Sequence, residues 1–198
     1  AEILQLKGFQ PDDAARAVHV FQEQKQNEVR RSVLAIGLKL KELSTEGKEL
    51  IDRSKYLRAS VWGKWQARAA SIAWVKEIPA KSVLLPLGLR DEHTSFVAML
   101  GLGKDAIRAR NHRFVDEERK RYQLLMVNAK KQALTDEQQR ALIVDEDNTL
   151  IVASAGSGKT SVIEAKYRYL VETGKANPGE ILLLAYNKKS AKEIKDRI

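Results

Sequence analysis

The feature that most constrains this chain is a short glycine-containing loop that ends in Gly-Lys-Thr. It reads Ala153-Ser154-Ala155-Gly156-Ser157-Gly158-Lys159-Thr160. The phosphate-loop pattern of nucleotide-binding proteins is G-x-x-x-x-G-K-S/T, and only its first position departs here, because Ala153 stands in place of glycine. A true phosphate loop joins a strand to a helix, so the motif predicts both elements around it.

Each residue type in this loop has a chemical reason to bind phosphate. Gly156 and Gly158 allow sharp backbone turns that direct successive N–H groups at phosphate oxygens. The N-terminus of the following helix adds unpaired amides and a favourable dipole. Lys159 would reach the β- and γ-phosphates, and the Thr160 hydroxyl would hold Mg²⁺. A glycine-rich turn between a strand and a helix can also be purely structural, but the flanking pattern favours nucleotide binding.

The residues on both sides of the loop have the pattern of an α/β protein. Thr149–Ala153 is a short β-branched run with strand character, and Ser161–Val171 has helical character. Further along, Ile181–Tyr186 is a second apolar strand and Asn187–Ile198 another helix. Strand, loop, helix, strand and helix are the opening of a parallel sheet. We therefore expect an incomplete α/β domain over residues 132–198, preceded by a helical region over residues 1–131.

The first half of the chain has the pattern of a long amphipathic helix with a coiled-coil-like stripe. Steps of four and three residues select a mostly apolar set, with Gly47 and Ser54 as points where the helix can bend or break. Its members are Val29, Val33, Ile36, Leu40, Leu43, Gly47, Leu50, Ser54, Leu57 and Val61. Further on, Lys104–Lys130 predicts another helix, whose many charges include pairs at the i,i+4 spacing of surface ion pairs.

A group of aromatic and basic residues lies at the end of the stripe and after it. It contains Trp62, Trp65 and Trp74, with Arg58, Lys64 and Arg68 among the rings. Aromatic rings between cations could stack on nucleic-acid bases. Trp62 and Trp65 are three residues apart on a helix, however, so packing against a neighbouring element is the better interpretation.

Composition limits the partners and the compartment. A net charge of +9 and a pI near 9.7 favour an anionic partner. The absence of cysteine excludes disulfides and cysteine-ligated zinc. No apolar run approaches the ~20 residues that span a bilayer, and the start does not have a signal-peptide pattern, so we expect a cytoplasmic protein without a membrane partner. The chain opens on Ala1 rather than methionine, so we expect that the natural N-terminus is missing.

Three separate segments resemble the UvrD/Rep branch of superfamily one DNA helicases. The first is the loop itself with alanine in first place. The second is Leu134-Thr135-Asp136-Glu137-Gln138-Gln139-Arg140-Ala141, which is similar to the family's adenine-reading segment. The third runs from Leu183 to Ile194 and resembles its first DNA-contacting motif. Ser154 and Asn187-Lys188 depart from the residues common in the family.

The resemblance assigns roles to residues that also have simpler explanations. Gln138 would contact the adenine, although Thr135-x-x-Gln138 is also a helix capping box. Tyr186 would stack on a base of single-stranded DNA, or else be a core residue at a strand end. Lys188 and Lys189 would contact DNA phosphates, or else form ordinary helix surface.

The full set of expected site residues combines the loop with the resemblance. Lys159 and Thr160 would be catalytic, and Thr160 would be a ligand of Mg²⁺. The residues expected to bind ATP are Gln138, Ala153, Ser154, Ala155, Gly156, Ser157, Gly158, Lys159, Thr160 and Ser161.

Within this branch, the residues before and after Leu134 most resemble DNA helicase IV and its relatives. They are Asn111, Phe114, Arg121, Tyr122, Leu125 and the phrase Asp145-Glu146-Asp147-Asn148. The resemblance implies the start of a RecA-like domain in an ATP-dependent helicase. Such an enzyme translocates on single-stranded DNA and unwinds duplexes with single-stranded tails, in repair or recombination.

Other interpretations remain open at this stage. The stripe at Val29–Val61 could be an arm of a helicase-like factor that binds RNA polymerase, and Ser154 is familiar from nuclease–helicase subunits. A remnant of a broken gene is a further alternative. The chain contains no later strand ending in Asp-Glu and none of the family's later arginines, so we expect it not to unwind DNA alone.

Overall fold

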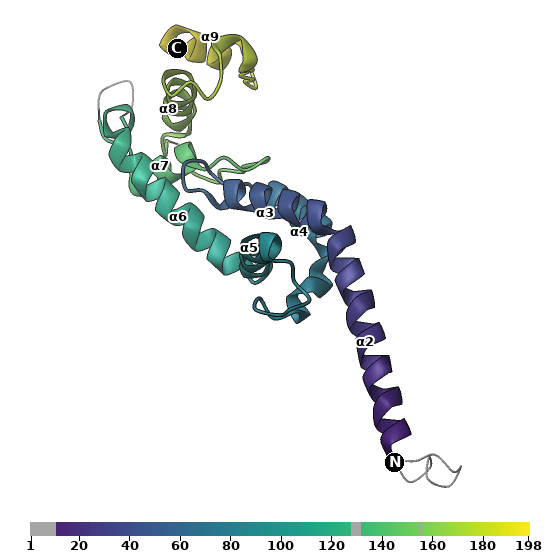
Figure 1. Cartoon of the computed structure of the whole chain (residues 1–198). Helices are drawn as coiled ribbons and strands as arrows, with labels where there is room; N and C mark the ends of the chain where they lie inside the picture. The colour runs from purple at the N-terminus through teal and green to yellow at the C-terminus, as the bar shows by residue number, and fades with distance from the viewer. Residues whose placement is uncertain (1–10, 128–131, 155) are drawn as a thin grey trace. The chain divides into compact units, whose positions relative to one another are not determined.

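The structure is a computed structural model that describes residues 11–127, 132–154 and 156–198, and all regular elements of this part are helical (Figure 1). The α-helices are α2 (Pro11–Ala35), α3 (Gly37–Ile51), α4 (Ala59–Ala70), α5 (Arg90–Leu100), α6 (Lys104–Arg121), α7 (Asp136–Ile143), α8 (Lys159–Glu172) and α9 (Lys188–Arg197). The 3₁₀ helices are η1 (Ala73–Glu77), η2 (Leu87–Leu89), η3 (Gln123–Leu125) and η4 (Pro178–Glu180). None of the described helices is long and apolar enough to cross a membrane.

The chain divides into two compact units that do not coincide with simple sequence halves. Within the described part, the first unit contains residues 11–52 and 62–102. The second contains residues 53–61 and everything described from residue 103 onward. The nine-residue segment Arg53–Val61 therefore belongs to the second unit, although both of its flanks belong to the first. The expected division between residues 131 and 132 lies beside residues outside the described part and stays a prediction.

The first unit is built on the predicted apolar stripe, but the stripe is divided among separate helices. Val33, Leu40 and Leu43 are buried as expected. The helix breaks at Ile36, between α2 and α3, and regular structure stops again after Ile51. Gly47 was a predicted weak point, yet it lies buried within α3.

The reason for a glycine at position 47 is close packing. A Cβ added there would lie 2.5 Å from Met99 Sδ and 3.0 Å from Trp65 Cε2. The Met99 and Trp65 side chains therefore occupy the space that a side chain at position 47 would need. Glycine stands there because of this packing and not because the helix bends.

Two of the three tryptophans, Trp62 and Trp65, pack in the core of the first unit, which confirms for them the packing interpretation over base stacking. Trp62 and Trp65 are buried and stack on each other, with ring centroids 4.7 Å apart and planes inclined by 12°. Trp65 Nε1 also donates a hydrogen bond to the Leu43 carbonyl at 3.0 Å. Trp74, by contrast, is partly exposed.

The second unit has its own hydrophobic core between α6, α7 and α8. The buried members of this core are Phe114, Val115, Met126, Leu134, Leu142, Ile143, Ala165 and Tyr169. Segment 53–61 packs against this core through Tyr56. The Tyr56 and Phe114 rings are edge to face, with centroids 6.1 Å apart and planes inclined by 74°. Asn111 fixes the backbone of the same segment, because its side chain accepts from Leu57 N at 3.1 Å and donates to Leu57 O at 2.8 Å.

The expected parallel sheet is not present, so the predicted fold class is wrong over the described residues. Thr149–Ala153 has irregular backbone, and so does Ile181–Tyr186; the described part contains only an isolated antiparallel bridge, between Val127 and Ala133. Local β-propensity does not make a strand unless its N–H and C=O groups find a partner strand. The two segments do not pair with each other, and most of their apolar side chains are exposed, including Leu150, Val152, Leu182 and Leu184. The helices predicted after both segments are confirmed as α8 and α9.

Candidate functional site

The glycines of the loop adopt the backbone conformation for which glycine was expected. Gly156 has φ 78° and Gly158 has φ 88°, which is the left-handed region that other residues rarely enter. Gly158 is the N-cap of α8, and Lys159 is the first residue of that helix. The unpaired amides at the start of α8 therefore follow the loop directly, as an anion-binding turn requires. Ala155 lies outside the described residues.

The lysine of the loop folds back over the residues that precede it. Lys159 Nζ donates to the carbonyl oxygens of Ala153, at 2.9 Å, and Ser154, at 2.6 Å. The ammonium group is exposed and lies at the loop, where an anion could exchange for these carbonyl partners. Thr160 and Ser161 are partly buried in the first turn of α8.

Gln138 performs the capping role and also reaches the loop. Its backbone N–H donates to Thr135 Oγ1 at 3.3 Å, and its Oε1 accepts from Thr135 N at 2.9 Å, which completes the capping box of α7. Its remaining amide nitrogen, Nε2, donates to the Ser157 carbonyl at 2.9 Å. The capping explanation is confirmed, and the structure brings Gln138 against the phosphate loop. Adenine contact stays a prediction.

The residues expected to contact DNA are at the surface around the start of α9. The Tyr186 side chain is fully exposed, at 103%, so the alternative in which it is a core residue does not hold. Lys188 and Lys189 are exposed in the first turn of α9, whose N-cap Asn187 accepts from Ser190 N at 2.8 Å. Nothing in this arrangement distinguishes DNA contact from ordinary basic surface, so these roles stay predictions.

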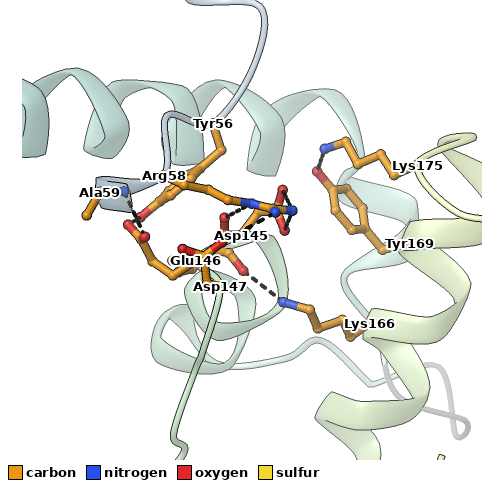
Figure 2. Close-up of polar contacts among 10 residues, drawn as sticks. Tyr56, Arg58, Ala59, Asp145, Glu146, Asp147, Lys166, Tyr169 and Lys175 are labelled. Carbon is orange, nitrogen blue, oxygen red and sulfur yellow. Dashed lines mark hydrogen bonds and ion pairs between the residues drawn. The ribbon is translucent and has the colours of Figure 1, made fainter. Parts of the chain in front are cut away.

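The acidic segment Asp145–Asp147 ends six residues before Ala153, the first residue of the loop, and it is bound by Arg58 (Figure 2). The Arg58 guanidinium donates to both carboxylate oxygens of Asp145, at 3.0 and 3.1 Å, and to the Asp145 carbonyl at 3.0 Å. It also lies 3.6 Å from Asp147 Oδ1. The bonds to the carboxylate both come from Nη2, and the bond to the carbonyl comes from Nε, so two nitrogens of the guanidinium bind the same residue. Charge-assisted hydrogen bonds of this kind are among the stronger ones.

Segment 53–61 also binds the middle residue of the acidic segment. The Tyr56 hydroxyl donates to Glu146 Oε1 at 3.0 Å, and the Ala59 amide donates to Glu146 Oε2 at 3.0 Å. Burial, followed by the bond to Glu146, raises the pKa of Tyr56 to about 12. We call these six residues, Tyr56, Arg58, Ala59, Asp145, Glu146 and Asp147, the acidic clasp.

Three further contacts attach α8 and the residues that follow it to the rest of their unit. Lys166 Nζ donates to the Val144 carbonyl at 2.8 Å, directly before the acidic segment, and burial lowers the pKa of Lys166. Lys175 Nζ lies 2.9 Å from a carboxylate oxygen of the buried Glu118, and the Tyr169 hydroxyl donates to the same carboxylate. Burial, together with this bond, raises the pKa of Tyr169. Figure 2 shows Lys166, Tyr169 and Lys175 beside the clasp.

Sequence reasoning missed the clasp as a structural feature. Asp145 and Glu146 drew attention only through the helicase IV resemblance, and Arg58 only as one of several cations near the tryptophans. The partners are 87 residues apart in sequence, so no local pattern could have paired them.

A family model matches the part of the chain that contains the loop. Residues 134–198 match the UvrD/REP helicase N-terminal domain. Residues 134–198 are similar to this family, and we call them the UvrD/REP-like segment. The match confirms the predicted resemblance over these residues, which include the phosphate loop, Gln138 and the Tyr186 segment.

Individual relatives of the UvrD/REP-like segment are named as DNA helicases. DNA helicase IV of Escherichia coli is 46% identical over 65 residues, which is 33% of this chain and 10% of the relative. A probable DNA helicase II homolog of Mycoplasma capricolum is 42% identical over 66 residues, 33% of this chain and 9% of the relative. The ATP-dependent DNA helicase PcrA of Staphylococcus epidermidis is 38% identical over 72 residues, 36% of this chain and 10% of the relative.

The extent of these matches is limited. The chain spans about a tenth of the length of the curated relatives it matches. No solved structure matches the chain.

Proposed function

We propose that the UvrD/REP-like segment binds ATP with Mg²⁺ and acts as the nucleotide-binding part of an ATP-dependent DNA helicase. The observation that carries this proposal is the geometry at the start of α8. Two glycines with positive φ precede the helix, Lys159 is its first residue, and the Gln138 amide is bonded to the loop between the glycines. This arrangement offers backbone amides, a helix N-terminus and a cation to a chain of phosphates.

The residues present fit the nucleotide, and each has a definite task. The amides of residues 156–160 would bind phosphate oxygens, and Lys159 would exchange its two carbonyl partners for the β- and γ-phosphates. The Thr160 hydroxyl would contribute one ligand to Mg²⁺. Among the described residues there is no cluster of His, Asp or Glu that could hold a metal by itself. Gln138 would turn its amide from the Ser157 carbonyl to the adenine. Bound ATP would supply the phosphoryl group whose hydrolysis drives movement along DNA.

DNA is the partner that the rest of the segment supports. Tyr186 offers an exposed ring for base stacking, and Lys188 and Lys189 offer cations for the phosphates. The relatives named above carry DNA helicase in their names, which favours translocation on single-stranded DNA and unwinding, in repair or recombination, by a cytoplasmic protein. None of those names mentions RNA polymerase or a nuclease, so neither alternative has comparable support.

The nucleotide part of the proposal is tested by titrating the full chain with a fluorescent ATP analogue, trinitrophenyl-ATP, in the presence of Mg²⁺. We expect saturable binding that Lys159→Ala abolishes or strongly weakens. Lys64→Ala is a matched control, because Lys64 is also an exposed helical lysine but lies in the first unit. Equal binding by the Lys159→Ala chain and the unchanged chain would refute phosphate binding by this loop.

A further inference from the structure

The stretch that joins the acidic segment to the phosphate loop has little structure of its own. Residues 148–154 belong to no helix, and Leu150 and Val152 are exposed. This stretch, which we call the connector, is fixed at its ends. At its far end, the Ala153 and Ser154 carbonyls accept bonds from Lys159. At its near end, the acidic clasp fixes residues 145–147.

We propose that Tyr56 and Arg58 are positioning residues for the phosphate loop: by holding the acidic segment, they set where the connector begins and so raise nucleotide affinity. This inference rests on the proposed function, since it assigns the control of that same site to a segment almost a hundred residues upstream.

The first argument concerns the conformational freedom of the loop. Lys166 binds the Val144 carbonyl to α8, and the phosphate loop ends at the start of the same helix. Residues 145–158 therefore form a loop whose two ends are both attached to α8. Within it, the clasp fixes three residues and leaves the connector as the free stretch. Without the clasp, the free stretch would extend back to Val144; without Arg58 alone, Asp145 and Asp147 lose their partner while Glu146 keeps its bonds to Tyr56 and Ala59. A longer free loop has more conformations to lose when it orders around a ligand.

The second argument concerns what the clasp does not do. The Arg58 side chain is 43% exposed and that of Asp145 49%, so their ion pair contributes little to global stability. The pair still fixes local geometry, because Arg58 Nη2 binds the Asp145 carboxylate while Nε binds the Asp145 backbone carbonyl, so the side chain and the backbone of Asp145 are both held. The arrangement is therefore better suited to orienting the connector than to holding the unit folded.

The first test measures nucleotide affinity in the full chain. We expect Arg58→Ala and Asp145→Asn to weaken trinitrophenyl-ATP binding about fivefold, at the lower end of coupling between linked sites. The exchanged pair Arg58→Asp with Asp145→Arg should recover most of the loss. Arg68→Ala is the matched control. Its side chain is 48% exposed, and its Nη1 donates to both carboxylate oxygens of Glu46, at 2.7 and 2.8 Å. Because this pair lies in the first unit, Arg68→Ala should leave the affinity unchanged.

The second test does not need a nucleotide. The chain has no cysteine, so spin labels can be placed at Thr149→Cys on the connector and Glu172→Cys at the end of α8, both exposed positions. Pulsed electron resonance then gives the distribution of distances between them. Arg58→Ala should broaden this distribution, and Arg68→Ala should not.

The two tests separate the outcomes. A broader distribution in a chain that fails to bind nucleotide supports positioning of the loop and refutes the proposed function. An unchanged distribution together with unchanged affinity in Arg58→Ala would overturn the positioning role. A third outcome would also overturn it. In that outcome Arg58→Ala loses affinity and also loses helical circular dichroism, and the exchanged pair recovers neither. The clasp would then act through folding alone.

Discussion

Replacing Gly158 by alanine should impair the phosphate loop more than the same replacement at Gly156. Both residues have positive φ, 88° and 78°, and an L-residue in that region costs about 1–2 kcal/mol. The surroundings differ. A Cβ at Gly156 would have no atom within 4 Å, whereas a Cβ at Gly158 would lie 2.9 Å from Gln138 Nε2.

The difference between the two sites can be estimated from the contact. To admit the methyl group, the Gln138 amide must move and give up its bond to the Ser157 carbonyl, which costs about 0.5–1.5 kcal/mol net. If nucleotide binding requires the observed loop, Gly156→Ala should weaken it about tenfold, since 1.4 kcal/mol is a factor of ten. Gly158→Ala should weaken it about fiftyfold, from roughly 2.4 kcal/mol in total.

The assay is titration of the full chain with trinitrophenyl-ATP, repeated with Gln138→Ala in the background. Removing the glutamine side chain removes the obstacle, so there the effect of Gly158→Ala should fall to that of Gly156→Ala. Gly174→Ala is the control, because Gly174 also has positive φ, 67°, but lies past the opposite end of α8. Equal effects of the two loop substitutions, or an effect of Gly158→Ala that persists without Gln138, would refute the reasoning.

Two further perturbations test the units separately. The fold raises the Tyr56 pKa from 10.0 to about 12, so this group contributes stability that is fully present below pH 10.0 and is lost as the pH rises through about 12. The free energy of unfolding, measured with urea over this pH range, should decrease less in Tyr56→Phe than in the unchanged chain. Identical pH profiles of the two chains would contradict the assignment. In the first unit, Gly47→Ala must displace Met99 and Trp65 and should lower the free energy of unfolding by about 1–3 kcal/mol. An unchanged urea midpoint would show that the α3 backbone is not closely packed there.

The features that sequence predicted well are those whose causes are local. The helix start at Thr135 follows from a capping box that four consecutive residues contain, and both of its bonds form. The positive φ angles of Gly156 and Gly158 follow from the loop motif. The side-by-side packing of Trp62 and Trp65 follows from their spacing on one helix.

The features that sequence predicted badly depend on distant partners. A strand at Thr149–Ala153 needs another strand beside it, and its own β-branched residues cannot supply one. Gly47 had the local signature of a helix weak point, but its role is set by Met99, which lies on α5. The clasp is the extreme case, because Arg58 and Asp145 each look like ordinary surface charges until the fold brings them together.

The clasp also explains what several residues of the helicase IV resemblance have in common. Asn111 bonds the Leu57 backbone in both directions, Phe114 contacts the Tyr56 ring, and the acidic segment binds Tyr56, Arg58 and Ala59. Much of this set thus has a shared task, which is to bind segment 53–61.

A boundary for the nucleotide-binding unit therefore cannot be drawn at a single point in the sequence. A chain that began at residue 103 would keep the whole UvrD/REP-like segment but lose every partner of Asp145 and Glu146 in the clasp. It would also remove both Leu57 bonds from the buried Asn111 side chain, which would keep only the bond that Arg110 donates to its Oδ1, and losing partners of a buried amide is costly. The smallest piece that keeps these contacts intact must include residues 53–61, and so must run through the first unit.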